Sequence, residues 1–95
     1  MILSQLVSEK IAELKRLDVS QLCNLPSVSE QKIRIKKKIV QVCTFRESSH
    51  EDRTIVIVKC FESHIFWSNA IADGFAITSN NVIVELDENE RATLY

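Results

Sequence analysis

The sequence predicts one α+β domain, in which an amphipathic N-terminal helix packs on a four- to five-stranded antiparallel, meander-like sheet that a short C-terminal helical turn follows. The spacing of hydrophobic residues changes from a helical period to alternation after residue 31. The connections between apolar runs are short, whereas parallel crossovers need about a dozen residues or more. With 95 residues, 45% hydrophobic and 26% charged, the chain can build one modest core, so we treat residues 1–95 as a single domain.

The first predicted element is a helix over residues 3–17. Its apolar residues step by three and four and fall on one side: Leu3, Leu6, Val7, Ile11 and Leu14. Ser4 is the expected N-cap. One amphipathic helix cannot bury its apolar side alone, so this side must pack on the rest of the chain or on a partner. Residues 18–31 are expected to be connecting chain, with Asp18 capping a short helical turn that ends before Pro26.

Two β-prone runs follow, over residues 32–36 and 39–45. In the first run Ile33 and Ile35 alternate with charged residues, which indicates a half-buried strand. The lysines between the runs form either the tip of a tight hairpin or the middle of one long bent strand, and we favour the hairpin. Residues 54–61 are the most strand-like segment, because they are apolar on both faces, and this predicts a central place in the sheet.

The last third of the chain contains one ambiguous segment and one clear hairpin. Residues 62–72 fit a helix or a strand, and Gly74 indicates a bend, a bulge or a close approach of two backbones. Residues 75–78 and 82–86 are predicted to pair as a hairpin, since asparagine tolerates the left-handed conformation of the tight turn between them. The chain then has the spacing of a capping box, with Asp87 three residues before Glu90, and this predicts a short helix.

The composition excludes several classes of function. There is a single glycine, whereas loops that cradle phosphates or dinucleotides need several, so we expect no nucleotide cofactor. The three cysteines, Cys23, Cys43 and Cys60, are odd in number and lack metal-ligand spacing, so we expect free, buried thiols in the reducing cytoplasm and no metal. The first ten residues lack the basic region and apolar core of a signal peptide, and every apolar stretch is shorter than the roughly 20 residues that cross a membrane, so we expect neither a signal peptide nor a membrane partner.

Charge is distributed unevenly along the chain. Residues 1–46 contain nine lysines and arginines against four acids, and residues 47–95 contain three against nine. Either the acidic segment near residues 85–90 neutralises the basic strand within the fold, or basic and acidic surfaces of different subunits meet in head-to-tail or two-fold association. The sequence leaves both interpretations open.

A cluster of basic residues is the first candidate site. It comprises Lys32, Arg34, Lys36, Lys37 and Lys38. Such a cluster on a β-ribbon could contact the phosphates of a nucleic acid or an acidic partner. The simpler interpretation is a solvated strand that resists edge-to-edge aggregation, because no aromatic residue lies among these lysines in the sequence. Nucleic-acid binding is therefore the alternative hypothesis and not the first.

A run of large apolar residues, Ile65, Phe66 and Trp67, is the second candidate site. Side chains alternate along a strand, so three such residues cannot all face one core. Either both faces are covered there or one face meets a partner, and protein interfaces favour aromatic residues. We therefore expect a non-enzymatic protein-interaction module that binds another protein or itself, with β-augmentation at a free sheet edge as one route.

Catalytic chemistry is the least supported expectation. Cys60 and His64 are four residues apart and could form a thiolate–imidazole pair, although Cys60 lies in a segment that reads as buried. Asp73, the one acid flanked by apolar residues, is expected to form an Asp-Gly turn. The other acids are accounted for by caps and loops. A Cys/His-dependent enzyme is thus the second alternative.

Overall fold

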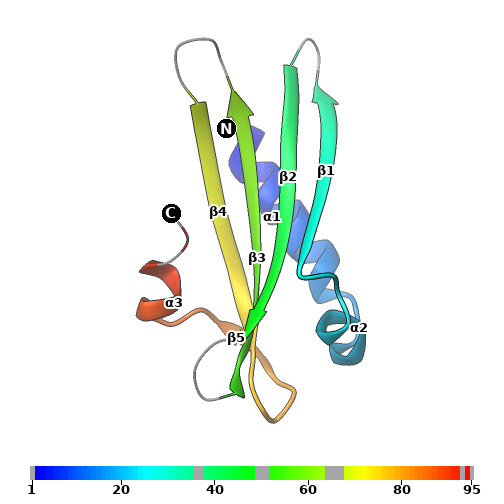
Figure 1. The fold of residues 1–95 in the computed structure, drawn as a ribbon, viewed down its shortest axis with the longest axis vertical. Coiled ribbons are helices and arrows are strands. Elements are labelled where there is room, and N and C mark those ends of the chain that lie inside the picture. Colours follow the sequence, from blue (N-terminus) through cyan, green and yellow to red (C-terminus); the bar gives the residue numbers. More distant parts are fainter. Residues whose placement is uncertain (1, 36–37, 49–51, 64–67, 93, 95) are drawn as a thin grey trace.

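The protein is an open five-stranded antiparallel sheet with a long helix against one face (Figure 1). The computed structural model describes all residues except 1, 36–37, 49–51, 64–67, 93 and 95. The elements are α1 (Ile2–Lys15), α2 (Val19–Cys23), β1 (Val28–Ile35), β2 (Lys38–Ser48), β3 (Thr54–Ser63), β4 (Ser68–Ile77), β5 (Ile83–Glu85) and α3 (Glu88–Ala92). The strands lie in the sheet in chain order, so the predicted α+β meander is confirmed.

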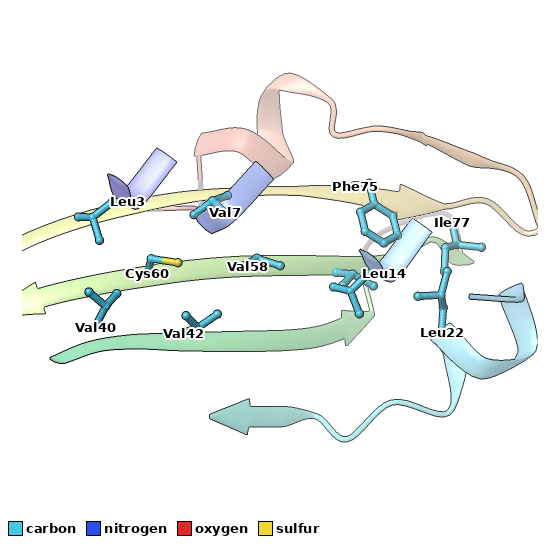
Figure 2. Packing of buried hydrophobic residues seen from close by; sticks show 11 residues of the cluster. Leu3, Val7, Leu14, Leu22, Val40, Val42, Val58, Cys60, Phe75 and Ile77 are labelled. Carbon is cyan, nitrogen blue, oxygen red and sulfur yellow. The ribbon is translucent and has the colours of Figure 1, made fainter. Parts of the chain in front are cut away.

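The apolar side of α1 packs on β3 and β4. Leu3, Val7 and Leu14 of this helix are buried against the sheet, and Leu22 of α2 extends the cluster (Figure 2). The predicted N-cap is wrong, because α1 begins at Ile2 and Ser4 lies inside it. The short turn after Asp18 is confirmed, and the Asp18 backbone N–H donates to Gln21 Oε1 at 2.9 Å.

Side chains alternate across the sheet and divide it into two faces. The face toward α1, here the helix face, carries the larger cluster of buried residues: Val40, Val42, Val56, Val58, Cys60, Phe75 and Ile77 (Figure 2). The opposite face, here the open face, carries a smaller cluster that packs on Leu86 and Leu94: Ile55, Ile57, Ala72 and Ala76. β3 contributes buried residues to both clusters and lies between β2 and β4, so its predicted central place is confirmed.

The basic segment forms a hairpin, and the interpretation as one long strand is wrong. β1 and β2 pair antiparallel from Ile35 opposite Lys38 to Val28 opposite Phe45. β1 begins at Val28, so the prediction that residues 28–31 are connecting chain is also wrong. Those residues are mostly polar and have weak strand preference, but their backbone pairs with β2, and this pairing decides their conformation.

β4 runs without interruption from Ser68 to Ile77 along β3, which settles the described part of the ambiguous segment as strand. Gly74 marks a close approach, since a Cβ atom at this position would lie 2.3 Å from the backbone oxygen of Val56. Asp73 is inside the strand, so the predicted Asp-Gly turn is wrong. Its carboxylate accepts a hydrogen bond from the Gly74 N–H at 2.8 Å and lies 3.6 Å from Arg91.

The hairpin between β4 and β5 is confirmed. The Thr78 N–H donates to the Val82 carbonyl at 2.9 Å, and the Asn81 N–H donates to the Thr78 carbonyl at 2.9 Å. Asn81 has a φ of 64°, in the left-handed region that asparagine tolerates. Across the described segments, no helix is long and apolar enough to cross a membrane.

Candidate protein-interaction surface

The open face is the part of the sheet that α1 leaves uncovered, and α1 lies behind the strands in Figure 1. Register places side chains of β1, β2 and β3 in rows across this face. Val28, Phe45 and Ile57 form one row, and Lys32, Gln41 and Phe61 form another. The β1–β2 side is the more exposed part, because Val28 is 58% exposed and Ile39, opposite Arg34, is 62% exposed.

A shallow groove of about 220 Å³ lies in the middle of the open face. Its lining consists of Phe45, Glu47, Ile57, Lys59, Phe61 and Leu94. The Lys59 ammonium lies 5.1 Å from the centre of the Phe61 ring, within the range of a cation–π contact. The groove therefore combines an apolar floor with one basic and one acidic side chain.

The outer edge of β1 is the second feature of this surface. β1 is the last strand on its side of the sheet, and within the described ranges β2 alone pairs with it. Its polar residues Ser29, Glu30, Gln31, Lys32 and Arg34 are exposed. An edge strand presents unpaired N–H and C=O groups that can accept another strand. The edge is therefore available for β-augmentation.

On the helix face, α1 does not reach over β1 completely. A groove of about 140 Å³ separates the two elements, and its lining consists of Leu6, Glu9, Lys10, Glu13, Gln31, Ile33 and Val42. Lys10 and Glu13 form an exposed ion pair of 3.7 Å on the helical rim. β1 is thus open at its edge and partly open on both faces.

The residues of the predicted basic cluster lie on different elements, and two of them are outside the described residues. Lys32 and Arg34 are exposed on the open face, Lys38 begins β2, and Lys36 and Lys37 lie outside the described residues. Although no aromatic residue lies among these lysines in the sequence, Phe61 shares a row with Lys32. Sequence reasoning missed this neighbour, and only the strand register with its alternation of side chains could have revealed it.

The acidic segment does not neutralise the basic strand, so that interpretation is wrong. β5 and α3 lie at the opposite edge of the sheet from β1. Glu90 is instead buried, 3% exposed, and its carboxylate accepts bonds from Arg53 at 2.8 Å and 3.2 Å. The capping box is confirmed, since Glu90 also accepts the Asp87 N–H at 3.0 Å and its own N–H donates to Asp87 at 2.8 Å. Arg53 was not singled out from the sequence.

The remaining predicted site residues are buried or outside the described residues. Ile65, Phe66, Trp67 and His64 are outside them, so their roles stay predictions. Cys60 is fully buried in the cluster under α1, and burial, with a smaller contribution from Cys43, raises the pKa of its thiol. A thiol with a raised pKa is protonated at neutral pH and is a poor nucleophile.

The other two cysteines differ from each other in exposure. Cys43 is buried, and burial, together with the nearby Glu30 carboxylate, raises the pKa of its thiol. Cys23 is exposed at the end of α2, so the expectation that every thiol is buried is wrong there. All three are free, and in the part of the chain that the structure describes, no group of three or more His, Cys, Asp or Glu residues is placed to hold a metal ion.

Comparisons with known proteins add no information about function. No protein family, no curated protein and no solved structure matches the chain. Function must therefore be inferred from the geometry of the open face and of the β1 edge.

Proposed function

We propose that this protein is a non-enzymatic protein-interaction module that associates with itself through the β1 side of its sheet. One observation carries the proposal: among the described residues, the two most exposed large apolar side chains lie on the free edge strand β1 and on its neighbour β2. Val28 and Ile39 are each more than half exposed, and they flank the charged pattern of β1. Exposed apolar groups beside an open edge are typical of surfaces that bind protein.

The energetics favour association at this side of the sheet. Burying a valine or isoleucine side chain completely contributes about 1.5–3 kcal/mol. Hydrogen bonds between two edge strands add to this, because each strand satisfies backbone groups of the other. The basic strand also carries Glu30, so it can offer both signs of charge to a second copy. Free thiols, two of them buried, further support our proposal that the module works in the reducing cytoplasm.

Sedimentation velocity over a range of protein concentrations tests the proposal. We expect the mass to rise from 10.9 kDa toward twice that value as concentration increases. Val28→Lys should shift the equilibrium to the monomer, because the added charge would have to be desolvated next to a basic strand. Val82→Lys is the matched control, since Val82 is 52% exposed but lies in the β4–β5 hairpin. A monomer at all concentrations would overturn the proposal.

A second candidate function, binding of single-stranded nucleic acid, is favoured by one observation. Phe61 is half-buried on the open face, with Lys59 over its ring and Lys32 in its row. Sheet faces that bind single strands combine aromatic rings, on which bases stack, with nearby basic side chains. Glu47 in the same groove and the net charge of −1 weaken this reading, so we rank it second.

Fluorescence anisotropy with a labelled single-stranded oligonucleotide at two salt concentrations separates the two candidates. If the face binds nucleic acid, affinity should fall as salt rises, and Phe61→Ala should cost about 1–3 kcal/mol for a lost stacked base. Gln5→Ala, at an exposed position of α1 on the other side of the sheet, is the control and should leave binding unchanged. Absence of binding at low salt removes this candidate.

A further inference from the structure

We infer that two copies of this chain join β1 to β1 in antiparallel orientation, about a two-fold axis that lies between Gln31 of one copy and Gln31 of the other. The two sheets then form one continuous sheet. The inference rests on the proposed self-association and adds to it the strand, the register and the symmetry.

Only some registers are open to an antiparallel pair of identical edges. In an antiparallel strand the N–H and C=O of one residue point to the same side, and successive residues point to opposite sides. The outward-pointing residues of β1 must therefore lie opposite outward-pointing residues of the second copy. This condition holds only when the axis sets one residue of β1 opposite the same residue of the second copy. It fails when the axis sets two neighbouring residues opposite each other. Below, an axis at a residue means that this residue lies opposite itself in the second copy.

Charge selects among these registers. With the axis at Gln31, Glu30 lies opposite Lys32 of the second copy, and symmetry repeats this pair. An axis at Glu30, Lys32 or Arg34 would set that residue opposite itself, and an axis at Ile33 would set Lys32 opposite Arg34. An axis at Ser29 would overlap little of β1, which begins at Val28. Opposite charges across antiparallel strands stabilise the pair and like charges destabilise it, so the Gln31 register is favoured.

The same register places the exposed apolar residues in one row across the joined sheet. Val28 lies opposite Arg34 of the second copy, and Arg34 lies opposite Ile39 within its own chain. The joined open face therefore has a row in which the aliphatic stem of Arg34 lies between Val28 of one copy and Ile39 of the other. Arginine commonly covers apolar neighbours with its stem while its charged end stays in water. Val28 therefore loses exposed surface when the two copies join.

On the helix face, α1 does not block this β1–β1 interface. α1 packs mainly on β3 and β4, so it leaves the edge of β1 accessible. Gln31 lies beside the groove between α1 and β1, and with the axis at this residue the grooves of the two copies adjoin across the joint. A two-fold joint of this kind uses the same edge on both copies, so assembly stops at the dimer.

Charge exchange on β1 tests the register. Glu30→Lys and Lys32→Glu alone should each raise the dimer dissociation constant about tenfold, because each puts like charges opposite one another twice. The two changes combined should restore the wild-type value, since position 30 of each copy again lies opposite a side chain of opposite charge at position 32 of the other. Glu88→Lys makes the same change of charge at an exposed residue of α3 and should leave the constant unchanged. Circular dichroism spectra confirm that each variant is folded.

Cysteine cross-linking tests the axis independently. In a Cys23→Ser background, Gln31→Cys should form an intermolecular disulfide under mild oxidation, because directly opposite Cβ atoms lie about 4.5–5.5 Å apart. Ser29→Cys should not, since the two substituted positions would be about 13 Å apart along the strands. Both residues are exposed on the same strand, so they are equally accessible to oxidant.

The outcomes separate the two proposals. A wild-type protein that is monomeric at all concentrations overturns the proposed function and this inference together. A dimer in which Gln31→Cys fails to cross-link, or in which the combined exchange is no better than the single ones, overturns this inference and leaves self-association standing. Restoration by the combined exchange together with selective cross-linking at residue 31 supports the two-fold β1 joint.

Discussion

Replacing Glu90 with alanine is expected to lower the free energy of unfolding by about 3–5 kcal/mol, the usual cost of breaking a buried ion pair. The Glu90 carboxylate is buried and accepts two bonds from Arg53, whose side chain is only 17% exposed. The substitution removes the countercharge from this enclosed guanidinium. It also removes the acceptor for the Asp87 N–H, so α3 loses half of its capping box.

Urea unfolding followed by circular dichroism measures this effect. Glu88→Ala is the matched control, because Glu88 lies in the same helix but is exposed, and it should change stability by less than about 0.5 kcal/mol. Equal midpoints for Glu90→Ala and the wild type would contradict the prediction. If the loss arises from an unbalanced buried charge, Glu90→Leu combined with Arg53→Met should be less destabilising than Glu90→Leu alone.

Gly74→Ala is expected to destabilise the protein by about 1–3 kcal/mol, as overpacking of a filled interior does. Alanine normally has the advantage in a strand, because glycine loses more conformational freedom on folding. Here the added Cβ would lie 2.3 Å from the Val56 carbonyl oxygen and 3.1 Å from the Ile57 Cα. Both atoms belong to the backbone of β3, so relief requires β4 to move away from the central strand.

Thermal and urea unfolding of Gly74→Ala measure the cost, with Ala70→Val as the control. Ala70 lies four residues earlier on β4 and is exposed, so a larger side chain has room there and should be nearly neutral. Two outcomes are informative. Destabilisation confined to Gly74→Ala supports the close approach, and an unchanged or raised stability of this variant contradicts it.

Local features were the ones that the sequence could predict. The capping box joins Asp87 to Glu90 three positions later, and the β4–β5 turn depends on residues within it, so each could be recognised without knowing the rest of the fold. The central place of β3 followed from apolar residues at successive positions, which need cover on both faces. The fold class required only these features and the short connections.

Features that depend on register could not be predicted. The Arg53–Glu90 pair joins residues 37 positions apart, and nothing local to Arg53 indicates it. The row of Lys32, Gln41 and Phe61 requires the register of two hairpins, and a shift by one residue would move each side chain to the other face. The start of β1 at Val28 depends on the length of its partner β2. The interaction surface is built from such relations, so only the structure revealed it.

The agreement between strand order and chain order has a consequence for how the chain folds. Each strand pairs with the strand that precedes it, so the sheet can grow by successive hairpins, each with a low entropic cost of loop closure. The contacts of α1 with β3 and β4 join elements that are distant in the chain. On a growing polypeptide this helix is made before the strands but cannot dock until β4 has followed, and until then its leucines stay in water. We therefore expect docking of α1 to follow the pairing of β4 with β3 and to be a slow step of folding, during which the nascent chain needs protection from aggregation.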